Sequence, residues 1–440
     1  MRTGPNSMGG SMLRFWTMGV AVGALTVSAA AEAQVSNAID TVVPIAFDRG
    51  RNESVLERAR PETNPVGYKV GGFTLLPTLD TQVGYTDNVY QTTSNQTDDA
   101  FLRVAPRLFA RSDWSRHSLQ LTGGGDFYRY AEATPRNQNG WSIGSLGRFD
   151  ATSDVALTLG LDTARRFESQ FSGAALVNVR SVTPYQQSQA RFMADARFAR
   201  VRVVGSLDYA KYNFMPVRTL TGFLISQDNR DREVARGAVQ MEYGLTPDTG
   251  LFGQVTYTGT SYDQQLAPNV ANRDSREIRV LTGVSLDLTA LLRGSVGIGY
   301  IDRRFTAPIY QNVSGLSFDS KLEYFPTALT TVTFNAFRDI QDSTFGGSGF
   351  FNTGAGLRFD HELLRNLLLN YNISYAENEF VGVPGKARVK QVGGGASYLA
   401  SRLLTGRLDL GYSRRDSDNV GLNGPALSEF RALAGVSIHP

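Results

Sequence analysis

Apolar and polar residues alternate along most of this chain with a period of two. In residues 147–167 (GRFDATSDVALTLGLDTARRF), the apolar residues from Val155 to Leu161 alternate with small or polar side chains. Such alternation predicts a β-strand with one apolar and one polar face. Segments of this kind, each roughly 11 to 14 residues long, follow one another from Gly72 to the C-terminus, and this length suits a tilted strand that crosses a membrane.

The connections between these segments alternate between short and long. The long ones are rich in Asn, Gln, Asp, Gly and Pro, as expected of exposed loops, and the longest fall at 169–185 and 215–231. Counting the segments gives about 18 strands, with both ends of the run on the side of the short turns, which is the layout of a closed outer-membrane barrel. The short connections fall at 112–117, 152–154, 199–200, 246–248, 289–291, 326–328, 363–366 and 401–403.

A β-propeller is the alternative, because roughly 40 residues per pair of hairpins is also the length of a propeller blade. Propeller strands, however, are usually about five or six residues long, and the inner ones are buried on both faces. The longer, two-faced segments of this chain therefore favour an all-β, closed antiparallel transmembrane barrel of about 18 strands over residues 72–440.

The polar face of these strands is too strongly charged for an ordinary outer surface, and no helical segment follows that could cover the apolar face. The arrangement that satisfies both faces has lipid outside, water inside and every backbone group paired around a closed ring. Leu157 should then face lipid and Asp162 the interior. The candidate pore-lining residues are Arg103, Arg107, Asp126, Asp162, Arg191, Asp195, Arg197, Arg279, Asp287, Asp319, Lys321, Glu323, Arg358, Asp360, Arg407 and Asp409.

The N-terminus has the features of a secretory signal peptide over residues 1–33. Arg2 and Arg14 form a positive region, residues 15–30 a short apolar stretch, and residues 31–33 an A-x-A cleavage site. Residues 34–71 mix charge, Pro and scattered apolar residues without periodicity, and they are expected to form a periplasmic tail or a partial plug. Residues 34–440 would carry 42 basic and 40 acidic side chains, so net charge gives no reason to expect nucleic acid as a partner.

Catalytic chemistry has little support in this sequence. The chain has no Cys and only three His, at positions 117, 361 and 439, all at or near short turns or the C-terminus. The Gly-rich pieces at 122–128 and 392–398 lack the surroundings of a phosphate-binding loop. We therefore expect no enzyme activity, no cofactor and no metal, and we expect the acidic side chains of the interior to pair with Arg and Lys.

Residues 59–130 carry the motifs RPE followed by PVG and GGF, then PTLDTQVGYTDNVY, then PRL followed by SDWSRH. This order resembles the putative β-barrel porin family of proteobacterial outer-membrane proteins, which are often found with exopolysaccharide synthesis and export genes. The resemblance implies a pore without catalytic residues. It also implies a Gram-negative outer-membrane location and a role in exopolysaccharide export.

We therefore expect a passive outer-membrane pore for a hydrophilic substrate, with both termini in the periplasm. The alternatives are a general diffusion porin for small solutes and a structural or adhesive barrel with a closed lumen. An inward-folded loop at 169–185 or 215–231 would favour the diffusion porin. Expected partners are outer-membrane lipid, the barrel-assembly machinery, polysaccharide and periplasmic export proteins.

Overall fold

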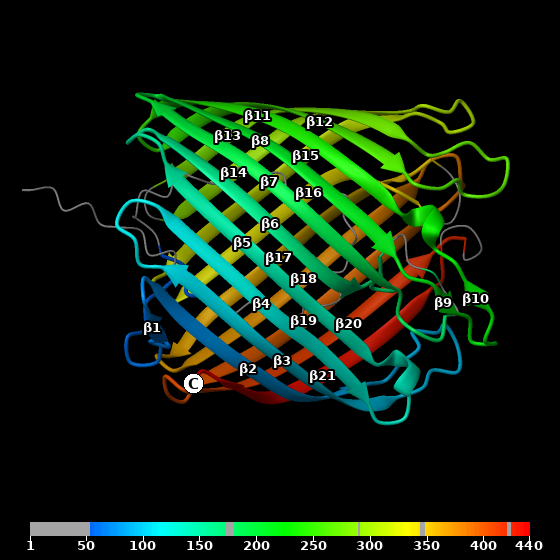
Figure 1. Cartoon of the computed structure of the whole chain (residues 1–440), viewed down its shortest axis with the longest axis horizontal. Coiled ribbons are helices and arrows are strands. Elements are labelled where there is room, and N and C mark those ends of the chain that lie inside the picture. The colour runs from blue at the N-terminus through cyan, green and yellow to red at the C-terminus, as the bar shows by residue number, and fades with distance from the viewer. Residues whose placement is uncertain (1–52, 173–175, 177–178, 289–290, 344–347, 420–423) are drawn as a thin grey trace, which may run out of the picture.

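Eighteen antiparallel strands close into a barrel in the computed structural model of this protein (Figure 1). The structure describes residues 53–172, 176, 179–288, 291–343, 348–419 and 424–440. Each barrel strand pairs with the next along the chain, and β2 pairs with β21 from Leu79 opposite Ile438 to Thr86 opposite Arg431. The predicted fold class is thus confirmed, whereas the predicted signal peptide lies outside the described residues.

The barrel strands are 12 to 15 residues long, which gives each enough length to cross a bilayer at a tilt. They are β2 (Phe73–Thr86), β3 (Asp99–Ser112), β4 (Ser118–Tyr130), β5 (Gln138–Asp150), β6 (Val155–Phe167), β7 (Pro184–Phe198), β8 (Val201–Phe214), β11 (Arg232–Thr246), β12 (Thr249–Tyr262), β13 (Ser275–Leu288), β14 (Leu292–Phe305), β15 (Val313–Thr327), β16 (Thr330–Gln341), β17 (Phe350–Leu364), β18 (Leu367–Phe380), β19 (Lys386–Leu399), β20 (Leu404–Ser417) and β21 (Leu427–Ile438).

Short connections gather at one end of the barrel and long ones at the other, as predicted. The C-terminus lies at the short-turn end, on the left in Figure 1. The boundaries differ by a residue or two from the sequence-based ones. For example, the turn expected at 326–328 lies at 328–329, because β15 continues to Thr327.

Several short strands and helices were not anticipated. β1 (Tyr68–Val70) lies within the predicted tail and pairs with Phe73–Leu75 of β2. The pairing of β2 with β21 begins further along β2, at Leu79. Gly71, in the two-residue turn between β1 and β2, has φ +59°, a conformation that glycine adopts without strain. The long-loop end carries the hairpin of β9 (Val217–Arg218) and β10 (Leu224–Ile225) and the single-turn 3₁₀ helices η2 (Thr134–Arg136) and η3 (Asp228–Arg230).

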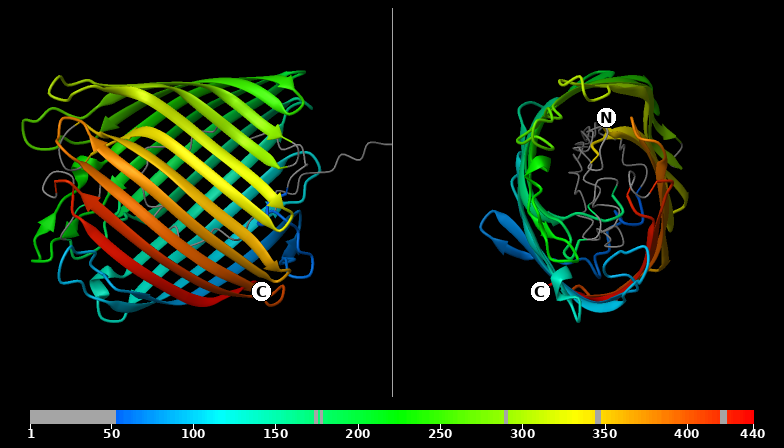
Figure 2. Two further views of the ribbon diagram at one scale, coloured as in Figure 1. Left: turned by 180° about the vertical axis from the view of Figure 1, so that it is seen from behind. Right: turned by 90° about the vertical axis from the view of Figure 1, so that its right-hand side faces the viewer.

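Viewed from the end, the wall encloses an oval interior (Figure 2). Its outer face is apolar and its inner face is polar. On β6, Leu159 and Leu161 expose 51% and 48% of their surface, whereas Ala156 on the alternate phase is buried. This alternation is the one that the sequence predicted. Among the described residues, no helix has the length and apolar character needed to span a membrane.

Candidate functional site: the polar interior of the barrel

The inner face of the wall is held together by ion pairs and hydrogen bonds that join neighbouring strands. Arg103 on β3 donates from Nε to Asp126 Oδ1 on β4 at 2.7 Å and from Nη1 to Gln82 Oε1 on β2 at 2.8 Å. Gln82 is buried and alternates with Val83, which exposes 64% of its surface on the outer face. Charged side chains on the same strand phase as Gln82 and Arg103 therefore lie inside the barrel, away from lipid.

The structure brings several of the sequence-predicted residues together as partners of one another. Each pair contains one cation and one carboxylate, so the inner wall carries little uncompensated charge where they meet. Besides Arg103 with Asp126, these pairs are Arg197 with Asp195 (3.5 Å), Arg279 with Asp319 (3.7 Å), Lys321 with Glu323 (3.6 Å) and Arg358 with Asp360 (2.8 Å).

Other predicted residues lie on the same inner phase with different partners. Arg107 and Arg407 each approach Asp80 to 3.8 Å. The remaining contacts are Arg191 with Asp208 (2.5 Å) and Asp409 with Gln82 (3.4 Å). Asp162 is exposed and lies opposite Gln189 in the pairing of β6 with β7. Asp287 is buried and lies opposite Arg293 in the pairing of β13 with β14.

Sequence reasoning missed Asp80, Arg202 and Asp208, three buried charged residues of the inner wall. Arg202 donates from Nε and Nη2 to the two oxygens of Asp195 at 2.8 and 2.6 Å. Each of the three lies on the polar phase of its strand, so the alternation itself could have identified it.

Residues 168–172, the first part of the long loop between β6 and β7, fold into the barrel and dock against strands that are far away in the ring. Arg415 on β20 is fully buried and donates from Nη1 to the carbonyl oxygens of Gln170 (3.4 Å) and Ser172 (2.8 Å). Between them, Phe171 packs with Val389 and Leu427 from β19 and β21. The first of the two candidate inward loops therefore folds inward over residues 169–172.

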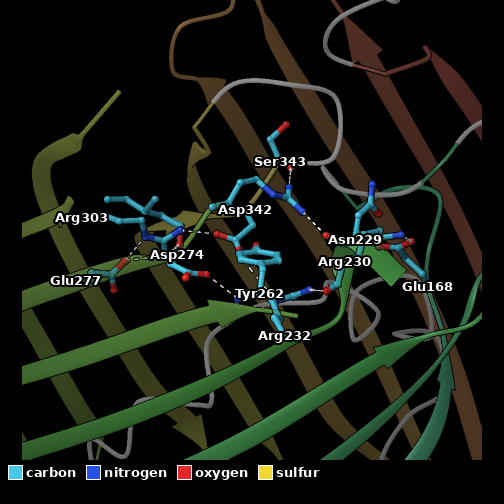
Figure 3. A network of polar contacts seen from close by, with 12 residues as sticks. Glu168, Asn229, Arg230, Arg232, Tyr262, Asp274, Glu277, Arg303, Asp342 and Ser343 are labelled. Atoms are coloured by element: carbon cyan, nitrogen blue, oxygen red, sulfur yellow. Dashed lines mark hydrogen bonds and ion pairs between the residues drawn. The ribbon is translucent and has the colours of Figure 1, made fainter. Parts of the chain in front are cut away.

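A second inward contact comes from the loop after β16, which the sequence did not single out (Figure 3). The Asp342 carboxylate accepts hydrogen bonds from Arg303 Nη1 at 2.7 Å and from the Tyr262 hydroxyl at 2.6 Å. Arg273 donates from Nη1 to the Ser343 carbonyl at 2.8 Å. Residues from β12, β14 and the loop between β12 and β13 thus hold this segment inside the barrel.

The surroundings of Asp342 favour its charged form. Burial disfavours ionisation, but Arg303 and Arg232 outweigh it and lower the pKa of Asp342 to about 2. The carboxylate is therefore charged at neutral pH, where it keeps its ion pairs with Arg303 and Arg232.

Arg230 in η3 links this region to the β6–β7 loop (Figure 3). Its guanidinium forms two hydrogen bonds with the buried Glu168 carboxylate, at 3.0 and 2.5 Å, and it lies over the Phe214 ring at 4.1 Å from the centroid. The base of the 215–231 loop is therefore buried in the barrel. Its tip is not, since Phe223 exposes 75% of its surface.

At the opposite, short-turn end, the segment before β1 lies against the inner wall. The Val55 amide donates to Thr331 Oγ1 at 2.9 Å, and Val55 itself is fully buried. Arg60 Nη2 lies 2.8 Å from Glu362 Oε2, and Glu57 Oε2 lies 2.8 Å from Arg293 Nη2. Residues 53–64 are thus attached to β14, β16 and β17 at this mouth.

The three histidines lie near the short-turn end and each contacts its own surroundings. His117 Nδ1 accepts from the Asp150 amide at 3.2 Å, His361 contacts Thr330 Oγ1 at 2.9 Å, and His439 contacts Thr78 Oγ1 at 3.3 Å. Within the described part of the chain, no group of three or more His, Cys, Asp or Glu side chains could hold a metal ion.

An 18-stranded wall with an apolar outside, a charged inside and loops folded inward defines a membrane channel of the porin type. By sequence, residues 60–432 match the family described as Putative beta-barrel porin 2, and the chain belongs to this family. The resemblance drawn from residues 59–130 is thereby confirmed. The protein is an outer-membrane β-barrel porin and not an enzyme. No curated protein matches the chain.

Several solved channels are similar to this chain at low sequence identity. Pseudomonas aeruginosa OccK2 (OpdF) is 12% identical, with a TM-score of 0.46 over 85% of this chain and 99% of that one. P. aeruginosa OpdK, solved with vanillate, is 10% identical, with a TM-score of 0.44 over 83% and 98%. A BenF-like porin from Pseudomonas fluorescens Pf-5 is 11% identical, with a TM-score of 0.44 over 83% and 99%.

Proposed function

We propose that this porin passes small hydrophilic solutes across the outer membrane by passive diffusion. The observation that carries the proposal is the docking of the β6–β7 loop on Arg415. A barrel of this size encloses a wide aqueous channel, and an inward loop reduces the diameter of that channel so that it can select solutes by size. Residues 53–64 narrow the other mouth in the same way.

The proposed passage is lined by the inner charged residues, including all those chosen from the sequence. Mixed guanidinium and carboxylate groups would exchange hydrogen bonds with a hydrated solute while the wall shields it from lipid. Since most of these groups are paired with opposite charges, we expect weak selection between anions and cations.

Export of an exopolysaccharide chain is the second candidate, and the resemblance of residues 59–130 to proteins of polysaccharide loci supports it. A polymer would need the β6–β7 loop and residues 53–64 to move aside, whereas a small solute would not. Periplasmic export proteins would then be the partners expected at the short-turn mouth.

Single-channel recording of the refolded protein in a planar bilayer, with added polysaccharide, separates these functions. We expect stable conductance that small sugars reduce slightly and a long polysaccharide leaves unblocked, because the docked loop denies it entry. Long polymer-dependent closures would favour export instead. Absence of conductance from folded, heat-modifiable protein would contradict both pore functions and favour a closed adhesive barrel.

We further propose that the short-turn end and both termini face the periplasm, after removal of residues 1–33, and that the assembly machinery inserts the barrel in this orientation. Phe223→Cys, in the exposed tip of the 215–231 loop, should then react with a membrane-impermeant thiol reagent on intact cells. Leu329→Cys, in the 328–329 turn, should react only after lysis. The reverse labelling pattern would invert the topology. The chain has no cysteine of its own, so the background is low.

A further inference from the structure

The barrel wall contains a seam where two neighbouring strands overlap instead of pairing. The ladder between β15 and β16 stops at Phe318 opposite Arg338, although β15 extends back to Val313 and β16 extends on to Gln341. The same residues keep their other partners, since Val313 pairs with Arg303 of β14 and Gln341 pairs with Phe350 of β17. Among the described ladders, this one stops furthest short of the long-loop end: three pairs of its register are missing, against two between β5 and β6, whose ladder ends at Trp141 opposite Arg165.

The last residues of β16 and the first residues of β17 lie beneath the edge formed by β14 and β15. By strand phase, Ile340 and Phe351 belong to the outer face, yet they are only 4% and 8% exposed. They pack against Ile301 and Val313, which belong to the inner face of the neighbouring strands. The outer face of one sheet edge is therefore covered by the inner face of the other.

Gly315 makes this overlap possible. A Cβ atom at this position would lie 3.0 Å from the Phe351 ring, which is tighter than nearly all Cβ contacts. A larger residue would therefore press on the ring and push the two layers apart.

Side chains replace the backbone hydrogen bonds that the seam lacks. Arg303 donates from Nη2 to the Ile340 carbonyl at 2.9 Å, and Ser317 Oγ donates to the Arg338 carbonyl at 2.8 Å. Arg279 Nη2 lies 3.3 Å from the Phe318 carbonyl oxygen and donates to it. Because backbone groups at membrane depth must be satisfied, these donors allow the ladder to stop without leaving bare carbonyls.

We propose that this seam is the gate of the pore, with the overlapped arrangement as its closed state. In the open state the ladder continues in the same register, so that Ser317, Leu316 and Gly315 pair with Asp339, Ile340 and Gln341. Ile340 and Phe351 then face lipid, as their strand phase already dictates. Both states are thus compatible with one sequence alternation.

Opening has two consequences for the interior. Placing β15 and β16 side by side adds about one interstrand spacing, ~4.8 Å, to the perimeter at the long-loop end. It also withdraws Asp342 and Ser343 from their contacts with Arg303 and Arg273. The expected change in conductance rests on the proposed pore function. The movement of the seam itself does not, and it can be measured without recording conductance.

A disulfide trap tests the movement, because the chain has no native cysteine. Leu316→Cys with Ile340→Cys places the thiols on opposite sides of the overlap in the closed state and on paired positions in the open state. Leu322→Cys with Phe334→Cys is the matched control, because this pair is opposed in the intact part of the same ladder. We expect the control to oxidise rapidly and the test pair to oxidise more slowly but completely in lipid vesicles.

The trapped barrel should show a larger single-channel conductance than its reduced form. If the test pair stays reduced while the control oxidises, the seam is static and the proposal is wrong. Oxidation without a change in an otherwise conducting pore would also overturn it. If the barrel never conducts, whether oxidised or reduced, the proposed pore function fails, and crosslinking still reports whether the seam moves.

A second variant addresses the overlap directly. Gly315→Leu should push the layers apart and accelerate oxidation of the test pair several-fold, whereas Gly253→Leu should not, since no atom lies within 4 Å of a Cβ added at Gly253. An unchanged oxidation rate in the Gly315→Leu background would count against the proposal.

Discussion

Deleting residues 34–66 should raise the single-channel conductance of the barrel by about twofold or more, because the narrowest part of a pore controls its conductance. The deletion removes buried Val55 and the ion pairs of Glu57 with Arg293 and of Arg60 with Glu362 at the short-turn mouth. The strands and the β1–β2 hairpin remain. Recording full-length and truncated protein under the same salt conditions measures the difference, and equal conductance would show that residues 53–64 do not obstruct the passage.

The attachment of this segment should also depend on pH. Burial opposes ionisation of Glu57, but hydrogen bonds from Arg293 and from the Ser54 amide outweigh it and lower its pKa below the usual 4.5. A carboxylate with a lowered pKa stabilises the docked state above pH 4.5 and loses this contribution as the pH falls through its folded-state pKa. Conductance of the full-length protein should therefore rise towards that of the truncated one in acid, and the truncated protein should lack this step.

Point variants can separate docking from the mere presence of the segment. Glu362→Gln weakens the contacts with Arg58 and Arg60 and should reproduce part of the increase. Arg365→Gln removes a nearby ion pair with Glu62. The side chain of Arg365 is 86% exposed and that of Glu62 is 64% exposed. Because exposed pairs contribute little, this control should leave conductance unchanged.

Replacing Arg415 with Met should release the β6–β7 loop from the far wall. The change removes charge-assisted hydrogen bonds to Gln170 and Ser172 and leaves their carbonyls buried without this donor. We expect a loss of about 2 kcal/mol in docking, which shifts the ratio of docked to free loop by ~30-fold. The loop should then become sensitive to protease added on the long-loop side, and recordings should show larger and noisier currents.

Arg414→Met is the matched control for this variant. Arg414 is the preceding residue of β20, faces outward and pairs with Asp416 at 2.8 Å, with 57% of its own side chain exposed. Its loss should change neither protease sensitivity nor current. If Arg415→Met behaves like this control, the packing of Phe171 and the contacts of Glu168 with Arg230 are sufficient to hold the loop.

The strands could be predicted from the sequence because a period of two places side chains on two faces whatever the surroundings are. The same rule assigns Arg103, Arg358 and Asp409 to the inner face from their positions along the chain alone. It could equally have found Asp80 and Asp208, which share that phase.

The alternation of apolar and polar residues assigns each residue to a face of its strand, but it does not show what covers that face. Ile340 and Phe351 have the phase of lipid-facing residues, and only the overlap of two sheet edges buries them. Asp342 belongs to a loop without periodicity, so nothing near it in the sequence indicated its partners Tyr262 and Arg303. Contacts of this kind depend on how distant segments meet in space.

The pairing of β1 with β2 has a consequence for how the ring is completed. The edge of β2 is shared between a neighbour only a few residues away, from Tyr68 to Val70, and the last strand of the barrel, from Arg431 to Ile438. The local hairpin can form early, whereas the distant pairing must wait for the whole chain. Since an unpaired edge recruits strands from other molecules, β1 shields part of the open edge during the period when an unfinished barrel is most exposed to misassembly.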